Sequence, residues 1–245
     1  MEVESININY DQWLTCIIGR NVYRIKVDDD FVNNVRSKTL NEYCQLIELQ
    51  SSPVFLYAKV PVNSLQHAKF LQEFNFNLIE TNITFVKSIE KKDVGQLDIR
   101  FADNDDQDEV VNLARRNFVY SRFHIDNDIP LKLANSIKAE WSRNYFLGKR
   151  GDQMVVALVD GTIAGFLQIL FGSNKDLIID LIAVDAKHHG KGIATNMITY
   201  AQNQLQQFKN IRAGTQLVNL PSIKLYEKAG FCISGAQYVF HYHNK

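Results

Sequence analysis

Apolar residues recur along the chain at two spacings, and the change from one to the other predicts strands and helices in turn. Residues 54–60 and 177–184 are apolar runs, and the β-branched second run suits a strand buried on both faces. Residues 64–74, 131–145 and 193–208 carry apolar side chains three or four positions apart, the period of a helix with one buried face. The chain is therefore predicted to fold as an α/β protein.

Turn residues divide the rest of the sequence. Residues 154–159 and 162–170 are apolar runs joined by Asp-Gly, the strongest short signal for a hairpin. Residues 120–130 show neither period and end at a proline, so we expect a long loop there. Further strands are expected at residues 83–86, 97–101, 211–216, 231–234 and 238–242, and further helices over Val110 to Phe118 and residues 221–229.

The chain is predicted to form two units. The charged segment 90–95 ends in glycine, which places a boundary between residues 1–92 and residues 96–245. The end of the first unit echoes the end of the second, with Asn75 and Gly230 as the residue types that most readily close a helix in the left-handed conformation. We interpret this as a degenerate repeat, although any strand–helix–strand pair shows similar echoes.

Composition narrows the classes of partner and compartment. Among 245 residues, Lys plus Arg and Asp plus Glu are equal at 27 each, so no net charge draws the protein to nucleic acid or to an acidic membrane. The cysteines, Cys16, Cys44 and Cys232, have no metal-ligand or disulfide-frame spacing, which favours a reducing compartment and no metal site. No apolar run reaches the roughly 18 residues of a membrane span, so we expect a cytoplasmic protein.

A glycine-bearing loop follows the apolar run 177–184 and opens the helix after it. The first amides of a helix lack internal partners and carry partial positive charge, so the loop is a candidate phosphate site. Gly190 and Gly192 allow close approach to the backbone, and Lys191 adds charge at the rim. The spacing fits neither the nucleoside-triphosphate loop nor the three-glycine dinucleotide fingerprint, and taken alone the loop is equally a tight turn.

Two motifs in the right order resemble the GNAT superfamily of N-acetyltransferases. His189, Gly192 and Ala194 fall on the marked positions of the acetyl-CoA loop, Q/R-x-x-G-x-G/A, with histidine in place of the usual Gln or Arg. The segment from Asn219 to Phe231 matches the pattern N-x-x-[A/S]-x-x-L-Y-x-K-x-G-F of the same superfamily. Both motifs together are far more specific than either one, so the chain is identified as a member of the superfamily.

The resemblance implies a fold and an acetyl-CoA site. The fold would be a central mixed, twisted sheet with two splayed parallel strands flanked by helices, preceded by a smaller α/β unit like a degenerate half of the same fold. The backbone of Ile182, Ala183 and Val184 would pair with the pantetheine arm, and Asn219 would bond to it and cap the next helix. The amides of the loop would hold the pyrophosphate, which assigns that role to His189, Gly190, Lys191, Gly192, Ile193 and Ala194.

The resemblance also assigns catalytic roles. Tyr226 would be the general acid that protonates the departing thiolate, since a phenol is protonated at pH 7; its alternative role is packing under the sheet. The general base stays open between His124 and a water relay. The first unit has no glycine loop and carries Leu71 where the second has Tyr226, so it is expected to be structural or to shape the acceptor site.

A narrower resemblance, covering both units, is to bacterial TDP-fucosamine acetyltransferases, which act on a TDP-4-amino-4,6-dideoxy sugar. It rests on Ser121, Arg122 and Phe123, on residues 214–216 including Gln216, on residues 238–242 and more weakly on residues 18–25. It implies Arg122 on a phosphate and Phe123 against a ring of the acceptor. A solvated arginine and a loop-anchoring phenylalanine are the alternative.

Two other functions remain open on the sequence alone. The acceptor could be a peptide N-terminus or a small polyamine, for which an acidic groove is expected instead of Arg122. The chain could also be an acyl-CoA-binding module without chemistry, which the presence of Tyr226 argues against. The expected partners are acetyl-CoA and a small amine, with a homodimer left open.

Overall fold

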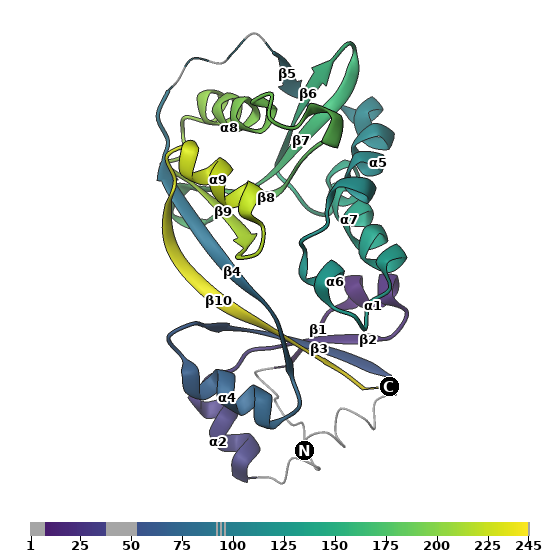
Figure 1. The fold of residues 1–245 in the computed structure, drawn as a ribbon, viewed down its shortest axis with the longest axis vertical. Helices are drawn as coiled ribbons and strands as arrows, with labels where there is room; N and C mark the ends of the chain where they lie inside the picture. The colour runs from purple at the N-terminus through teal and green to yellow at the C-terminus, as the bar shows by residue number, and fades with distance from the viewer. Residues whose placement is uncertain (1–7, 38–52, 92, 94, 96, 245) are drawn as a thin grey trace.

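The protein is described here from a computed structural model, which describes residues 8–37, 53–91, 93, 95 and 97–244 (Figure 1). Its described strands form one mixed sheet in the order β1-β2-β3-β10-β4-β9-β8-β7-β6-β5. The strands are β1 (Ile8–Tyr10), β2 (Asn21–Ile25), β3 (Val54–Pro61), β4 (Asn77–Ser88), β5 (Asp98–Phe101), β6 (Gln153–Val159), β7 (Thr162–Phe171), β8 (Asp176–Val184), β9 (Asn210–Gln216) and β10 (Cys232–His243).

Helices cover both faces of this sheet. They are α1 (Gln12–Ile18), α2 (Asp29–Ser37), α4 (Leu65–Glu73), α5 (Gln107–Asn117), α6 (Arg122–Ile125), α7 (Leu131–Phe146), α8 (Ile193–Gln204) and α9 (Leu220–Lys228). Helices α8 and α9 pack on one face over β7, β8 and β9, with α2 and α4 further along the same side, and α1, α5, α6 and α7 lie on the other side (Figure 1). We call the sheet face beneath α1, α5, α6 and α7 the α7 face.

The two predicted units share the sheet by exchanging strands. β4, the last strand of the first unit, lies between β10 and β9, and β10, the last strand of the second, lies between β3 and β4. Each unit thus completes the sheet of the other. The order β3-β10-β4-β9 is the one expected if β3–α4–β4 and β9–α9–β10 are equivalent and related by a twofold axis.

The ends of α4 and α9 support this equivalence in detail. Asn75 and Gly230 both have a positive φ, at 61° and 85°, as predicted for the left-handed closing residue. The next amide bonds back to the same place in each helix, Phe76 N to Leu71 O and Phe231 N to Tyr226 O, both at 2.9 Å. Leu71 therefore occupies in the first unit the position of Tyr226 in the second.

The central parallel strands separate partway along their length. β8 and β9 pair from Asp176 with Asn210 to Ile179 with Ala213. Both strands continue, β8 against β7 to Val184 and β9 against β4 to Gln216, but over these described residues they no longer pair with each other. Beyond Ile179 and Ala213 the facing backbone edges of β8 and β9 are not hydrogen-bonded to each other, which is the splay that the resemblance predicted, and we call this unpaired stretch the gap between β8 and β9.

Several local predictions need correction. The expected long loop at residues 120–130 contains the short helix α6, because Ser121 O accepts the amides of His124 and Ile125 at 2.7 and 3.1 Å. The two expected closing strands form one continuous strand, β10. Its register with β4 shifts at β-bulges, so the strand is not interrupted at its irregular positions. The last helical turn expected at residues 205–208 is lost, since α8 ends at Gln204.

Other expectations concern thiols, membranes and the boundary. Cys16 and Cys232 are free thiols, and Cys44 lies outside the described residues, as do Lys92, Val94 and Gln96 at the expected boundary. Of the helices that the structure describes, none has the length and apolar character needed to cross a bilayer.

Candidate active site

The loop between β8 and α8 presents a row of unpaired backbone amides. Helix α8 begins after Gly192, whose carbonyl accepts the Asn196 amide at 3.0 Å. The amides of residues 190–195 have no hydrogen-bond partner among the described residues. Because the helix dipole adds positive charge at the same place, this loop fits a pyrophosphate better than any neutral group.

Gly190 and Gly192 shape this loop through their backbone. Their φ angles are 77° and 76°, in the left-handed region that side chains disfavour. A Cβ on Gly190 would meet nothing within 4 Å, and one on Gly192 would meet only the Asn196 side-chain amide at 3.5 Å. Glycine is therefore needed here for the conformation, and no internal clash would follow its replacement.

His189, the position that departs from the family pattern, turns back onto the strand. Its Nε2 donates a hydrogen bond to Val184 O at 2.9 Å, which ties the loop to the end of β8. Lys191 is exposed at the rim, with its Nζ 3.3 Å from Nδ1 of His188. Ile193 is buried in the core under α8, so its amide and not its side chain is available to a ligand.

The gap between β8 and β9 begins next to this loop. Ile182 and Ala183 pair on one edge with β7, while the edge facing β9 is unpaired. Asn219, at the start of α9, accepts the Ser222 amide on its Oδ1 at 3.2 Å, so the predicted capping role is confirmed. The pantetheine role of Asn219 stays a prediction.

Tyr226 projects from α9 into the core on the face opposite α7. Its ring is 2% exposed and packs against Phe85 of β4 and Phe231, just before β10, at 5.3 and 5.4 Å between ring centroids. Burial raises the pKa of the hydroxyl above its ordinary value, so the phenol stays protonated at neutral pH. The hydroxyl has no hydrogen-bond partner in the described part of the chain, which leaves its proton available to a ligand.

Arg122 lies on the α7 face, held between aromatic rings. Its guanidinium carbon is 4.0 Å from the ring centroid of Tyr57 and 4.4 Å from that of Phe123, and its Nη1 lies 3.1 Å from Nε2 of His241. Burial lowers the pKa of Arg122, but an arginine remains charged even so. The desolvated cation is thus available to an anionic group.

The neighbours of Arg122 in the chain pack and hydrogen-bond within the protein. Phe123 is 1% exposed and packs in the core, so its ring supports Arg122 and leaves no face for a ligand ring. Ser121 is buried and its Oγ lies 2.6 Å from Nδ1 of His124, whose Nε2 lies 3.0 Å from Oδ1 of Asn135. With both ring nitrogens occupied, and with burial lowering its pKa, His124 is a poor general base.

Glu80 on β4 is a carboxylate that the sequence analysis did not single out. It is the cross-strand partner of Val239 on β10, whose partner on the other side is Lys59 of β3. Glu80 is 9% exposed. One oxygen bonds to the side chain of Gln216 at the end of β9, and Oε2 has no partner among the residues described. Burial raises the pKa of Glu80, so this carboxylate is a stronger proton acceptor than an exposed one.

Lys138 adds a second cation, this one buried, to the α7 face. It is 8% exposed, and its Nζ lies 4.9 Å from the ring centroid of Phe118 and 4.7 Å from that of Trp141. Burial lowers the pKa of Lys138 to about 8. Trp141 also donates Nε1 to Asp180 Oδ2 at 2.8 Å, and Asp180 pairs with Arg150 at 2.6 Å. A lysine inside the apolar stripe of α7 was the signal that the sequence offered.

Two histidines and an aspartate form a cluster between two arginines. Asp126 Oδ2 lies 2.5 Å from Nδ1 of His241 and 2.7 Å from Nε2 of His243. The second ring nitrogens face guanidinium groups, His241 with Arg122 at 3.1 Å and His243 with Arg20 at 2.5 Å. Three such ligand atoms within 4.8 Å are compatible with a metal ion, but the surroundings argue against one.

A metal would have to take the two nitrogens that now face Asp126. The protons would then move to the nitrogens that face Arg122 and Arg20, where donor would meet donor. Metal-bound histidines instead direct the other ring N–H to an acceptor. The cluster therefore fits a hydrogen-bonded network in which each imidazole donates to Asp126 and accepts from an arginine.

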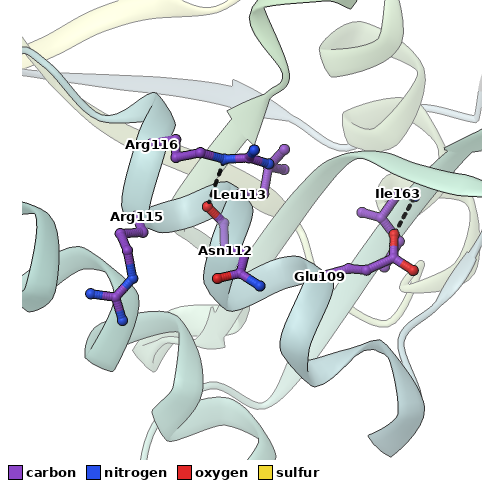
Figure 2. A pocket seen from close by; sticks show the side chains of 6 residues that line it. All are labelled: Glu109, Asn112, Leu113, Arg115, Arg116 and Ile163. Carbon is purple, nitrogen blue, oxygen red and sulfur yellow. Dashed lines mark hydrogen bonds between the residues drawn. The ribbon is translucent and has the colours of Figure 1, made fainter.

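A surface pocket of about 280 Å³ lies elsewhere on the molecule (Figure 2). Figure 2 shows that Glu109 accepts a hydrogen bond from the Ile163 amide and that Arg116 donates one to Asn112 O. The distances are 2.9 and 3.2 Å, so both side chains already bond to other residues of the protein. No residue expected to bind acetyl-CoA or the acceptor lines it, and we assign it no substrate.

Comparison with known proteins agrees with this geometry. The sequence model of the acetyltransferase (GNAT) family matches residues 108–231. The spore coat polysaccharide biosynthesis protein SpsD of Bacillus subtilis (strain 168) is 29% identical over 211 residues, which cover 83% of this chain and 72% of that protein. Streptothricin acetyltransferase of Escherichia coli is 33% identical over 81 residues, 32% of this chain and 47% of that protein.

Solved structures share the fold at low identity. A functionally unknown conserved protein from Staphylococcus epidermidis ATCC 12228 superposes with a TM-score of 0.67 at 15% identity, over 99% of this chain and 93% of its own. A tandem GNAT protein from the clavulanic acid biosynthesis pathway has a TM-score of 0.59 at 13% identity, over 91% and 75%. The similarity to the tandem GNAT protein spans both predicted units of this chain.

Proposed function

The chain belongs to the acetyltransferase (GNAT) family, and from that premise we propose that it transfers acetyl from acetyl-CoA to the amino group of a nucleotide-linked amino sugar. The proposed acceptor is a TDP-4-amino-4,6-dideoxy sugar. One observation carries the proposal. The gap between β8 and β9 adjoins unpaired amides at residues 190–195, and beside it the α7 face carries two cations, the half-buried Arg122 and the buried Lys138.

The arrangement suits a donor and an acceptor that enter from different sides. Acetyl-CoA would lie with its pyrophosphate on the loop amides and its pantetheine along the free edge of Ile182, Ala183 and Val184. The acceptor would lie on the α7 face, with its diphosphate on Arg122. A charge-assisted contact from a desolvated arginine is the strong kind of hydrogen bond, and it selects a phosphate over a neutral group.

The chemistry can be written with its protons balanced. Glu80 takes one proton from the acceptor ammonium, and the resulting amine attacks the thioester carbonyl. The C–N bond forms, the C–S bond breaks, and Tyr226 gives its proton to the departing thiolate. The proton on Glu80 passes to solvent, and the nitrogen, cationic after its attack, then loses its second proton through Glu80 to solvent. The Tyr226 phenolate regains a proton from solvent, so the products are the acetamido sugar, CoA thiol and one net proton.

The relatives support a sugar acceptor. SpsD is named for polysaccharide biosynthesis and aligns with 83% of this chain, which is more than the second unit alone. The α7 face also favours anionic acceptors over polyamines, since Arg122 and Lys138 would repel a polycation.

A thiol-release assay with acetyl-CoA tests the proposal. We would compare TDP-4-amino-4,6-dideoxygalactose with the same amino sugar lacking its nucleotide, with a peptide bearing a free N-terminus and with spermidine. The proposal expects the TDP-sugar to be preferred in kcat/KM by at least about tenfold, the size of one charged hydrogen bond. Equal use of the sugar with and without its nucleotide would overturn the acceptor class, and preference for the peptide or spermidine would replace it.

A further inference from the structure

The hydrogen bonds around Asp126 fix the protonation of both histidines. Each guanidinium can only donate, so the histidine nitrogen facing it must accept. The nitrogen of each ring that faces Asp126 must then carry the proton and donate it to Oδ2. The order of donors is therefore Arg122 to His241 to Asp126 on one side, and Arg20 to His243 to Asp126 on the other.

The ionisation of these groups agrees with that order. Burial lowers the pKa of His241 to about 3, so the ring is neutral at physiological pH. Burial alone would raise the pKa of Asp126, but the hydrogen bonds from His241 and His243 hold it well below its usual range. His241 is wholly buried, and its ring also packs edge-on against Phe55 at 4.7 Å between ring centroids.

This network meets Arg122 at one edge of its guanidinium. The rings of Tyr57 and Phe123 lie within cation–π distance of the guanidinium, and the His241 nitrogen fixes its rotation. Tyr57 is itself held, because its hydroxyl donates to Asp11 Oδ2 at 2.9 Å. Arg122 is thus kept in one orientation before any ligand arrives, which spares the ordering cost that a free arginine has on binding.

We propose that His241 is a positioning residue for the acceptor, acting through Arg122. Its neutral Nε2 accepts one guanidinium hydrogen and so directs the others at the anionic group of the acceptor. This rests on the proposed function, since it needs Arg122 to bind the diphosphate. The role belongs jointly to both units, because β3 of the first unit supplies Tyr57 and β10 of the second supplies His241.

Two substitutions at one position separate positioning from simple packing. In His241→Gln the side-chain oxygen reaches toward Arg122 and keeps an acceptor there, but the contact with Asp126 is lost. In His241→Asn the shorter amide keeps a donor to Asp126 and loses the acceptor for Arg122. Positioning expects Asn to raise the acceptor KM about tenfold and Gln to raise it no more than about threefold.

The same variants are then made in an Arg122→Ala background. If His241 acts through Arg122, His241→Asn adds nothing further once the arginine is gone. With Arg122 intact, the kcat of the two His241 variants at saturating acceptor and their KM for acetyl-CoA stay within about twofold of wild type. Should His241→Asn fail to fold, Tyr57→Leu removes another restraint on the guanidinium and is expected to show the same KM effect and the same loss of effect without Arg122.

The outcomes distinguish this inference from the proposed function. Equal harm from Gln and Asn, or harm that persists in the Arg122→Ala background, overturns the positioning role and leaves the acceptor assignment standing. If Arg122→Ala leaves the acceptor KM unchanged, Arg122 does not bind the diphosphate, and the positioning role of His241 is overturned as well.

Discussion

At the scale of single residues, Tyr226 and Leu71 show what distinguishes the two units. They occupy equivalent positions in α9 and α4, next to closing turns with the same hydrogen bonds. Both are buried, so packing alone does not require a hydroxyl at either position. The hydroxyl of Tyr226, unpartnered among the described residues, is the chemical addition in the second unit.

We predict that Tyr226→Phe lowers kcat by about 10²- to 10⁴-fold while the KM for acetyl-CoA changes little. The ring that packs against Phe85 and Phe231 is retained, and only the proton for the thiolate is lost. Tyr200→Phe on α8 is the matched control, and steady-state kinetics with a check that chemistry limits the rate is the measurement. A kcat within about twofold of wild type would reduce Tyr226 to packing.

Glu80 makes a second prediction at this scale. Because burial raises its pKa and the base must be ionised, kcat/KM should rise with pH as Glu80 loses its proton, above the ordinary glutamate value of about 4.3. Glu80→Gln should lower kcat about 10²-fold or more and remove this acidic limb from the pH profile. A profile with the limb intact in Glu80→Gln would assign the limb to another group, and Glu90→Gln is the exposed control.

At the scale of elements, substitutions in the loop before α8 can separate the effect of backbone conformation on stability from the effect of ligand contact on acetyl-CoA binding. Gly192→Leu and Gly161→Leu each force a side chain into a left-handed backbone, at φ 76° and 75°, and each should cost about 1–2 kcal/mol of stability. Only Gly192→Leu should also raise the KM for acetyl-CoA, by about tenfold or more, because its side chain projects where the ligand would lie. Thermal unfolding and acetyl-CoA titration measure the two effects separately, and an unchanged KM would place the cofactor elsewhere.

Elements were predictable from the sequence wherever their signal is local. The hairpin of β6 and β7, the cap at Asn219 and the left-handed residues Asn75 and Gly230 follow from turn and cap chemistry within a few positions. The short helix α6 was missed because four residues are too few to show a period.

At the scale of the whole molecule, strand exchange makes the two units interdependent. β10 pairs on both edges with strands of the first unit, β3 and β4, and β4 covers the edge of β9. We predict that a fragment of residues 97–245 does not melt cooperatively alone and regains a cooperative transition and acetyl-CoA binding when mixed with residues 1–91. Circular dichroism with temperature measures this. A cooperative transition of the fragment alone would mean that the second unit folds without its exchanged strand.

The arrangement around Arg122 lay beyond sequence reasoning for the same reason. His241 and Asp126 are far apart in the chain and meet only because β10 crosses to β3 beside α6. Glu80 became a candidate base only once β4 was seen beside β9, since nothing near it in the sequence marks a buried carboxylate. Arg122 itself was found from its loop, but its orientation comes from pairing across the whole sheet.

The interlocked sheet also constrains how the protein is made. During synthesis β3 is complete early, yet its partner β10 is not available until residues 232–243 have left the ribosome. Until then one edge of β3 and both edges of β4 lack their final neighbours, and such edges can pair with other chains. The nascent first unit should therefore be a client of chaperones that shield strand edges, and the last strand to emerge is the one that closes both halves at once.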